Sequence, residues 1–317
     1  QLVADLPPEL PASVLISLHI SSEGTSVLHN ILSRAASLEA SQAVSGERLQ
    51  RGHIYVAPPD RHLLIRGSEI HLSAGPRENG HRPAIDPLFR SAARAYGSRV
   101  IGVVLTGTLD DGTDGLRLIK ERGGCTVVQD PEDATYGEMP ASAIDFVDPH
   151  RIVPLAEMGK VITEMIDSPL EPGGDHSVAD PREQPMDLVE VELGHEGPEG
   201  EASLLTCPEC GGVLMEREDG GVVRFACQVG HAYSPESLVE HQGDALESAL
   251  WQALRTLEER ADLLYRMAKR AERRDMPDTG SRMGERADRI TRHATEIRNT
   301  ILRLRDGESR DGTPLGP

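Results

Sequence analysis

The sequence predicts an α/β domain with a mostly parallel sheet, followed by a small zinc ribbon and an α-helical hairpin. Three observations support this fold class. Short apolar runs alternate with helical patterns over residues 1–167, which is typical of a parallel sheet covered by helices. Three cysteines and a histidine cluster within residues 204–234. Residues 235–305 carry two apolar stripes at helical spacing, which favour two packed helices.

Within the first 167 residues, strands and helices can be assigned from their apolar periodicity and from the glycines that follow them. The expected strands are "SVLISLHI" (13–20), "GHIYVAPP" (52–59), "RHLLIRGSEIHLS" (61–73, two strands around a turn), "RVIGVVLTG" (99–107) and "CTVVQD" (125–130). The expected helices are "GTSVLHNILSRAASL" (24–38), "AIDPLFRSAARAYG" (84–97), "GTDGLRLIKERGG" (112–124) and "MPASAIDFV" (139–147).

An acidic segment, residues 168–203, follows this domain. It contains ten acidic residues and one arginine among scattered prolines and glycines, so it cannot bury a core and we expect a disordered linker. The whole chain has a formal net charge of −19, which argues against nucleic acid as a partner because nucleic-acid binding needs a basic surface. The sequence contains no apolar stretch long enough to span a bilayer and no signal-peptide pattern at its start, so we expect a cytoplasmic protein.

The cysteine pattern predicts a metal site. Cys207, Cys210, Cys227 and His231 form C-x2-C…C-x3-H, the spacing of a zinc ribbon with a closed tetrahedral Cys3His site. A closed site is structural, because catalysis needs an open position on the metal, and bound Zn²⁺ would stabilise a module too small to fold on apolar burial alone. The alternative is a set of ordinary reduced cysteines. Cys125 stands apart and is interpreted as a small core residue.

The C-terminal stripes predict an antiparallel helical hairpin or coiled coil over residues 235–305, with a disordered tail at 306–317. The stripes are broken at "DMPDTGS" (275–281). We interpret them as the core between the two helices. The hairpin is also a candidate surface for self-association or partner binding.

Titratable residues are expected at two strand ends, where functional residues gather in open α/β sheets. His19 ends the strand at 13–20, and Asp110 and Asp111 follow the strand at 99–107. If these strand ends are adjacent, an aspartate can fix the tautomer of His19 and stabilise its protonated form, leaving the histidine as a general base. The alternatives are an aspartate that caps the following helix and a histidine that is a satisfied structural side chain.

Several motifs in residues 1–165 resemble one known family. They are "SLHISSEGTSVL", "HIYVAPPDRHLLI", "NGHRPAIDPLFRSAA", "LTGTLDDGTDGL" and "VVQDPEDATYGEMPASAI", in order and at plausible spacing. This region resembles the catalytic domain of CheB-type protein-glutamate methylesterases of bacterial chemotaxis and phosphorelay signalling. The resemblance implies a three-layer α/β domain with a Ser-His-Asp triad. It also implies hydrolysis of glutamyl methyl esters, and deamidation of glutamine, on chemoreceptors.

The resemblance assigns roles to individual residues. The family histidine matches His19, and the aspartate before glycine in Thr-Gly-x-x-x-Asp-Gly matches Asp111. The oxyanion donor matches the backbone N–H of Thr108, where the family usually has methionine. Arg82 lies in the matching substrate-bordering loop, where it would orient an acidic receptor segment or form a surface salt bridge.

The family nucleophile has no counterpart in these residues. It lies on a Gly-x-Ser-x-Gly-Gly-like turn after the first strand, and no such segment precedes His19. We therefore expect an N-terminally truncated chain whose first strand and nucleophile turn lie upstream of Gln1, and a 317-residue form that is nearly inactive.

These motifs leave other functions open. Typical members of the family carry a phosphorylatable receiver domain in front, and none is visible in these residues. A non-catalytic signalling or scaffold protein that binds partners through the ribbon and hairpin is the main alternative. A general esterase acting on small molecules is another.

Overall fold

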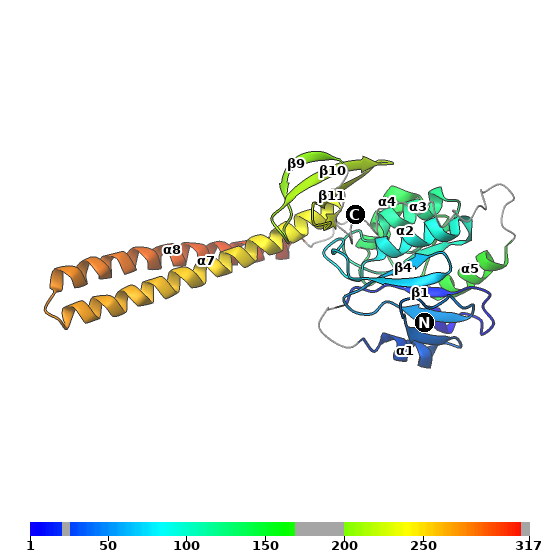
Figure 1. Cartoon of the computed structure of the whole chain (residues 1–317), viewed down its shortest axis with the longest axis horizontal. Coiled ribbons are helices and arrows are strands. Elements are labelled where there is room, and N and C mark those ends of the chain that lie inside the picture. The colour runs from blue at the N-terminus through cyan, green and yellow to red at the C-terminus, as the bar shows by residue number, and fades with distance from the viewer. Residues whose placement is uncertain (21–25, 169–199, 312–317) are drawn as a thin grey trace. The chain divides into compact units, whose positions relative to one another are not determined.

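The computed structural model describes residues 1–20, 26–168 and 200–311. The chain forms two compact units, 1–239 and 240–317, and Figure 1 shows their elements. The expected linker lies almost wholly in residues 169–199, and the end of the expected tail is residues 312–317; both lie outside the described residues. In the described part of the chain, no helix combines the length and apolar character that crossing a bilayer requires.

The first unit contains the expected α/β domain. Its parallel strands are β1 (Val14–Ile16), β2 (Glu39–Gln42), β3 (His53–Val56), β6 (Ile101–Val104), β7 (Cys125–Gln129) and β8 (Arg151–Val153), in the orders β1-β3-β2 and β6-β7-β8. The hairpin β4 (His62–Arg66) and β5 (Glu69–Ser73) is antiparallel. The helices are α1 (Leu28–Ala35), α2 (Ile85–Tyr96), α3 (Thr113–Glu121), α4 (Glu138–Val147) and α5 (Leu155–Asp167), with short 3₁₀ turns η1 (Leu2–Ala4) and η2 (Gly97–Arg99).

Helices cover both faces of the sheet that contains β3. Ile54 and Val56 pack in one buried cluster with side chains of α1 and α5. Tyr55, between them, points into a second cluster with Leu88 of α2. This alternation follows from the two-residue repeat of a strand, which sends successive side chains to opposite faces. The mostly parallel α/β fold predicted from the sequence is confirmed.

Residues 200–234 form an antiparallel sheet that we call the cysteine module. It consists of β9 (Glu201–Thr206), β10 (Val213–Asp219), β11 (Val222–Cys227) and β12 (Ala232–Tyr233), in the order β12-β11-β10-β9. Residues 201–203 were expected in the linker, but they belong to β9 because Ala202 pairs with Met215 of β10. The module has its own small core, in which Leu214 and Tyr233 are fully buried.

The second unit is the expected helical hairpin. It is built from α7 (Pro235–Glu272), whose first turns lie in the first unit, and α8 (Pro277–Asp311). The predicted apolar stripes meet, with Leu254, Ala294 and Ile301 buried together. Helix α8 begins inside the expected break, because proline is well tolerated in the first turn of a helix. It also continues to Asp311, past the boundary at residue 305 where the tail was expected.

Candidate active site

His19 and Asp111, the two candidate residues at strand ends, lie in contact. His19 follows β1 and Asp111 follows β6, so each extends from the carboxyl end of its strand. The Nε2 atom of His19 is 2.6 Å from Oδ2 of Asp111. The carboxylate is buried, with 2% of its side chain exposed, whereas the imidazole is 23% exposed. The contact therefore joins a shielded acid to a base that solvent or a substrate can reach.

The environment of Asp111 keeps its carboxyl group ionised. Oδ2 also accepts a hydrogen bond from the backbone N–H of Ile85 at 2.7 Å, and Oδ1 accepts one from Nδ2 of Asn79 at 3.1 Å. Burial is the largest influence and by itself would raise the pKa of Asp111. The hydrogen bond and charge of His19, together with the Ile85 and Asn79 donors, outweigh burial and hold this pKa well below its usual range. An ionised Asp111 stabilises the protonated imidazole.

The orientation of the His19 ring decides which atom can take up a proton. Because Nε2 faces Asp111, Nδ1 is the atom left to accept a proton from a nucleophile. The ring is stacked on His81, with centroids 3.9 Å apart and planes 13° apart. His81 is itself held by a 2.6 Å hydrogen bond from its Nδ1 to the carbonyl oxygen of Asn79. Stacking limits rotation of the His19 imidazole about its χ2 bond.

The turn after β6 presents the backbone of Thr108. The N–H of Gly107 donates to the carbonyl of Tyr136 at 2.9 Å, and the N–H of Leu109 donates to Oε2 of Glu138 at 2.9 Å. A Cβ on Gly107 would lie 2.0 Å from Sδ of Met139, so any larger residue would have to displace the buried Met139 side chain. Thr108, between the two clamped residues, is exposed, and its N–H donates to no acceptor within the described residues. It is available as a donor to an oxyanion.

Arg82 is held by the protein itself. Its Nε and Nη2 atoms donate to Oδ1 of Asp60 at 2.9 and 2.6 Å. Its Nη1 atom donates to the carbonyl oxygens of Ala74 and Gly75. The hydrogen bond and charge of Arg82 lower the pKa of Asp60. The guanidinium thus connects the loop at residues 79–83 to two other segments, one at Asp60 and one at Ala74 and Gly75.

The four candidate metal ligands converge in the cysteine module. The ligand atoms of Cys207, Cys210, Cys227 and His231 all lie within 4.8 Å of one another. The sulfurs of Cys210 and Cys227 are 3.6 Å apart, and Nδ1 of His231 is 3.6 Å from the sulfurs of both Cys207 and Cys227. Tetrahedral Zn²⁺ with Zn–S bonds of about 2.3 Å places sulfurs about 3.8 Å apart, so the donor set fits this metal.

A carboxylate also supports the histidine of this cluster. Oε2 of Glu209 is 3.4 Å from Nε2 of His231, while Nδ1 of the same ring faces the sulfurs. Histidines that bind metals commonly have such a partner on the second ring nitrogen, because it fixes the tautomer and the ring orientation. The arrangement around His231 therefore fits that of a metal ligand.

Comparison with known proteins identifies the family of this domain. The sequence profile of the family described as CheB methylesterase matches residues 1–162, which is half of the chain. The chain belongs to the CheB methylesterase family. We call residues 1–162 the CheB domain.

Curated relatives carry the same family name. The chain is 36% identical over 160 residues to protein-glutamate methylesterase/protein-glutamine glutaminase 2 of Anaeromyxobacter dehalogenans, covering 50% of this chain and 47% of that protein. It is 36% identical over 168 residues to protein-glutamate methylesterase FrzG of Myxococcus xanthus, covering 53% of this chain and 50% of FrzG. The chain thus spans about half the length of these relatives.

A shorter relative and a solved structure match over most of their own length. A putative protein-glutamate methylesterase/protein-glutamine glutaminase of Leptospira interrogans is 36% identical over 167 residues, which cover 52% of this chain and 86% of that protein. The crystal structure of the Thermotoga maritima CheB methylesterase catalytic domain matches at 29% identity with a TM-score of 0.49, covering 51% of this chain and 88% of that one.

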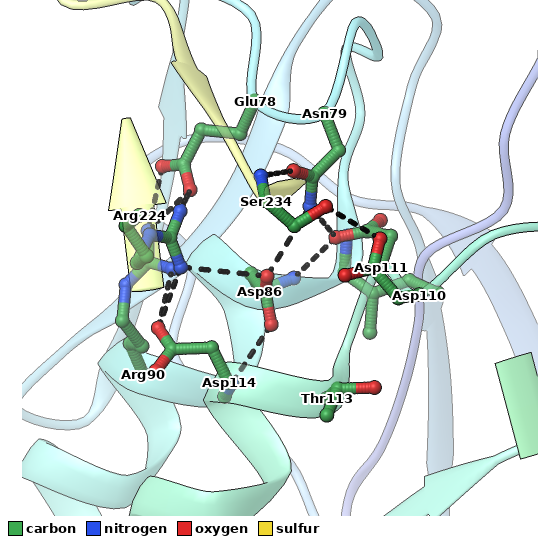
Figure 2. A network of polar contacts seen from close by, with 12 residues as sticks. Glu78, Asn79, Asp86, Arg90, Asp110, Asp111, Thr113, Asp114, Arg224 and Ser234 are labelled. Atoms are coloured by element: carbon green, nitrogen blue, oxygen red, sulfur yellow. Dashed lines mark hydrogen bonds and ion pairs between the residues drawn. The ribbon is translucent and has the colours of Figure 1, made fainter. Parts of the chain in front are cut away.

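The structure adds residues to the site that sequence reasoning missed. Figure 2 shows a polar network in which Arg224 and Ser234 of the cysteine module meet side chains of the CheB domain beside Asp111. The loop that begins with Asn79 was recognised as a family motif, but Arg82 was the residue singled out from it. Asn79 is 3% exposed, although polar side chains of this type are mostly exposed. The sequence carries no signal that the module lies against this loop.

Asp110, expected to be solvated or to cap α3, instead belongs to this network. Oδ1 of Asp110 accepts a 2.7 Å hydrogen bond from Oγ of Ser234. The N-cap residue of helix α3 is Gly112 and no side chain caps the helix, so neither Asp110 nor Asp111 has the capping role. Burial raises the pKa of Asp110 to about 6, although the Ser234 hydroxyl opposes this shift.

Asp86 gives a testable pH dependence. Burial, followed by repulsion from Asp111, raises its pKa to about 8, against the opposing charges of Arg224 and Arg90 and with a further contribution from Asp114. A raised pKa means that the folded state binds the proton more tightly than the unfolded state. The stability that Asp86 contributes is therefore present below pH 4 and is lost as the pH rises towards 8.

We expect Asp86→Asn to remove this dependence, because a neutral amide resembles the protonated carboxyl group. Urea unfolding of the full chain at pH 5 and pH 8 measures it. The stability of the unchanged chain relative to Asp86→Asn should fall between these pH values, by a few kcal/mol at most. The exposed Asp145→Asn is the control. A difference that stays constant from pH 5 to pH 8 would mean that Asp86 is ionised throughout.

Proposed function

We propose that the CheB domain supplies the histidine and aspartate of a Ser-His-Asp hydrolase that demethylates glutamyl side chains, and deamidates glutaminyl side chains, of chemotaxis receptors. The observation that carries this proposal is the 2.6 Å contact between His19 and the buried, ionised Asp111. The names of the relatives, protein-glutamate methylesterase and protein-glutamine glutaminase, supply the substrate class. The clustered free thiols support a reducing compartment such as the cytoplasm.

The proposal assigns each residue a role that its position in the site supports. Nδ1 of His19 takes the proton of a serine hydroxyl, and the alkoxide attacks the ester carbonyl. Asp111 holds the imidazole and stabilises its protonated form. The N–H of Thr108 donates to the oxyanion of the tetrahedral intermediate. His19 then gives its proton to the leaving methanol, and water releases the glutamate by the same steps in reverse.

The proposal takes the nucleophile to come from residues upstream of Gln1. The two serines on either side of β1 have other hydrogen-bond partners: Ser13 donates to the carbonyl of Gln50 and Ser17 donates to the carbonyl of Ala84. Ser21 and Ser22 lie outside the described residues. These hydroxyls therefore do not support an assignment as the nucleophile.

Methanol release from a methylated receptor segment tests this proposal. The 317-residue chain and a chain extended upstream through the family's Gly-x-Ser-x-Gly-Gly turn are compared at equal concentration. We expect methanol from the extended chain and close to none from the 317-residue chain. A small methyl ester serves as a second substrate, because comparable turnover of both substrates would point to a general esterase. Equal activity of the two chains would refute the assignment of the nucleophile.

We assign a structural Zn²⁺ to the Cys3His cluster. The four donors leave no open coordination position, so the metal would hold the module together rather than take part in the reaction. Structural zinc contributes on the order of 10 kcal/mol or more to the folding of such modules.

We expect Cys207→Ser to lose the metal and the fold of the cysteine module, while Cys125→Ser keeps both. The measurements are zinc content per chain and amide hydrogen exchange of residues 200–234, which should become unprotected when the metal is lost. The CheB domain, with its own buried clusters, should remain protected. Full zinc content in Cys207→Ser would show that this cysteine is not a ligand.

A further inference from the structure

The cysteine module is bonded to the loop that carries Asn79. The backbone N–H of Asn79 donates to the carbonyl of Ala232 at 2.8 Å, and the N–H of Ala232 donates to the carbonyl of Arg77 at 3.3 Å. The N–H of Ser234 then donates to Oδ1 of the Asn79 side chain at 3.0 Å. Strand β12 is thus paired with this loop through backbone hydrogen bonds at Ala232. The next contact, at Ser234, is made to the side chain of Asn79 instead of to the loop backbone.

That last contact determines which end of the Asn79 amide faces Asp111. An amide side chain has one end that accepts and one that donates hydrogen bonds. Because the Ser234 N–H is a donor, it requires the oxygen of the amide on its own side. The nitrogen of Asn79 must then face the opposite way, where it donates to Oδ1 of Asp111 at 3.1 Å and to Oδ2 of Asp86 at 3.3 Å. Without Ser234, the amide loses the partner that selects this orientation.

Arg224 of β11 also attaches the module to the CheB domain, through ion pairs. Its guanidinium is 2.5 Å from Oδ2 of Asp114, 2.9 Å from Oε2 of Glu78 and 3.5 Å from Oδ2 of Asp86 (Figure 2). Glu78 and Asp114 are only 13% and 12% exposed. Without Arg224, Glu78 would keep Arg90 and Asp114 would keep Arg90 and Arg117, but both buried carboxylates would lose the one cation that the module supplies. This loss weakens the attachment of the module to the domain.

We propose that the cysteine module is a positioning element of the active site, in which Ser234 and Arg224 act through Asn79 to hold Asp111 against His19. The inference rests on the proposed function, because it takes His19 and Asp111 to be the catalytic pair. It also links metal binding to that pair. The ligand Cys227 ends β11 and the ligand His231 comes directly before β12, so a metal that folds the module fixes the segment leading to Ser234.

The proton on Nε2 of His19 reports this positioning directly. An imidazole proton in a short hydrogen bond to a carboxylate gives a far-downfield proton NMR resonance, and its exchange with water measures how well the bond is held. If the module only stabilised other parts of the chain, changes in the module would leave the exchange of this proton with water unaltered. The measurement needs no activity, so it can be made on the 317-residue chain.

The experiment compares the unchanged chain with Arg224→Met, with Asn79→Leu and with the chain after removal of metal by a chelator. Asn79→Leu keeps the ion pairs of the module and removes the amide link. It also places leucine on a left-handed backbone (φ 49°), so the fold controls below apply to this variant above all. Ser234→Ala keeps the backbone N–H and should have a smaller effect than Asn79→Leu. Arg282→Met removes an exposed arginine of α8 and is the control. Far-UV circular dichroism and protection of the CheB domain confirm that each variant is folded.

We expect the exchange of the His19 proton to become about tenfold faster or more in Arg224→Met, in Asn79→Leu and after metal removal. It should be unchanged in Arg282→Met. If the resonance is absent from the unchanged chain, the His19–Asp111 pair itself is absent and the proposed function fails. If it is present and Arg224→Met, Asn79→Leu and metal removal leave it unaltered, the function stands and the module has no positioning role. Slower exchange on metal removal would show that the module opposes the pair, and would also overturn this inference.

Discussion

His19→Gln in the upstream-extended chain is expected to lower kcat for methyl ester hydrolysis by about 10⁶-fold, while KM changes little. Glutamine cannot accept the serine proton, so the nucleophile stays a weak hydroxyl group. In serine hydrolases of this type, loss of the histidine alone costs nearly as much as loss of the whole triad.

Methanol release measures this effect, and His293→Gln is the matched control. His293 lies on α8 with 64% of its side chain exposed and an ion pair only to Glu296 of the same helix. Activity of the control should equal that of the unchanged chain. A His19→Gln chain that retains activity within about tenfold of the unchanged chain would show that another group is the base.

Asp111→Asn should lower kcat by about 10⁴-fold and leave the fold intact. The substitution keeps the shape of the side chain but replaces an acceptor with a donor. If the asparagine nitrogen faces His19, it favours the tautomer with the proton on Nδ1, the atom that must accept the serine proton. It also removes the negative charge that stabilises the imidazolium.

Asp110→Asn is the control for this substitution, because the neighbouring carboxylate bonds Ser234 of the module rather than His19. We expect a loss of less than about tenfold in kcat for it. The pH profile adds a second readout. Because the pKa of Asp111 lies well below its usual range, its titration should not limit activity above about pH 4. Equal losses in the two variants would contradict the separate roles assigned to the adjacent aspartates.

The strands and helices that could be predicted are those with strong periodicity. The buried runs that form β3 and β6 and the amphipathic pattern of α3 were all visible in the sequence. Strand β2 was not, because its sequence "EASQ" is polar and only Ala40 is buried on it. It forms because its backbone pairs in parallel with β3 at the edge of the sheet, and an edge strand needs one apolar face at most.

The residues of the candidate site also fall into those that could be predicted from the sequence and those that could not. The positions of His19 and Asp111 at strand ends are local properties, and their meeting follows from the rule that parallel strands end on the same side of a sheet. The metal ligands were predicted because their spacing is itself the signal. The contact of Ser234 with Asn79 joins residues 155 positions apart. It depends on how two separately folded parts pack, for which neither periodicity nor spacing gives a signal.

A double-mutant cycle between His19 and Asp111 tests the central claim, that these two side chains act as one unit, most directly. It compares kcat of the upstream-extended chain with that of His19→Gln, Asp111→Asn and the double variant. Because Asp111 acts only through the imidazole, we predict that the double variant is about as slow as His19→Gln alone. If the two losses multiply instead, the side chains act independently and the account is wrong.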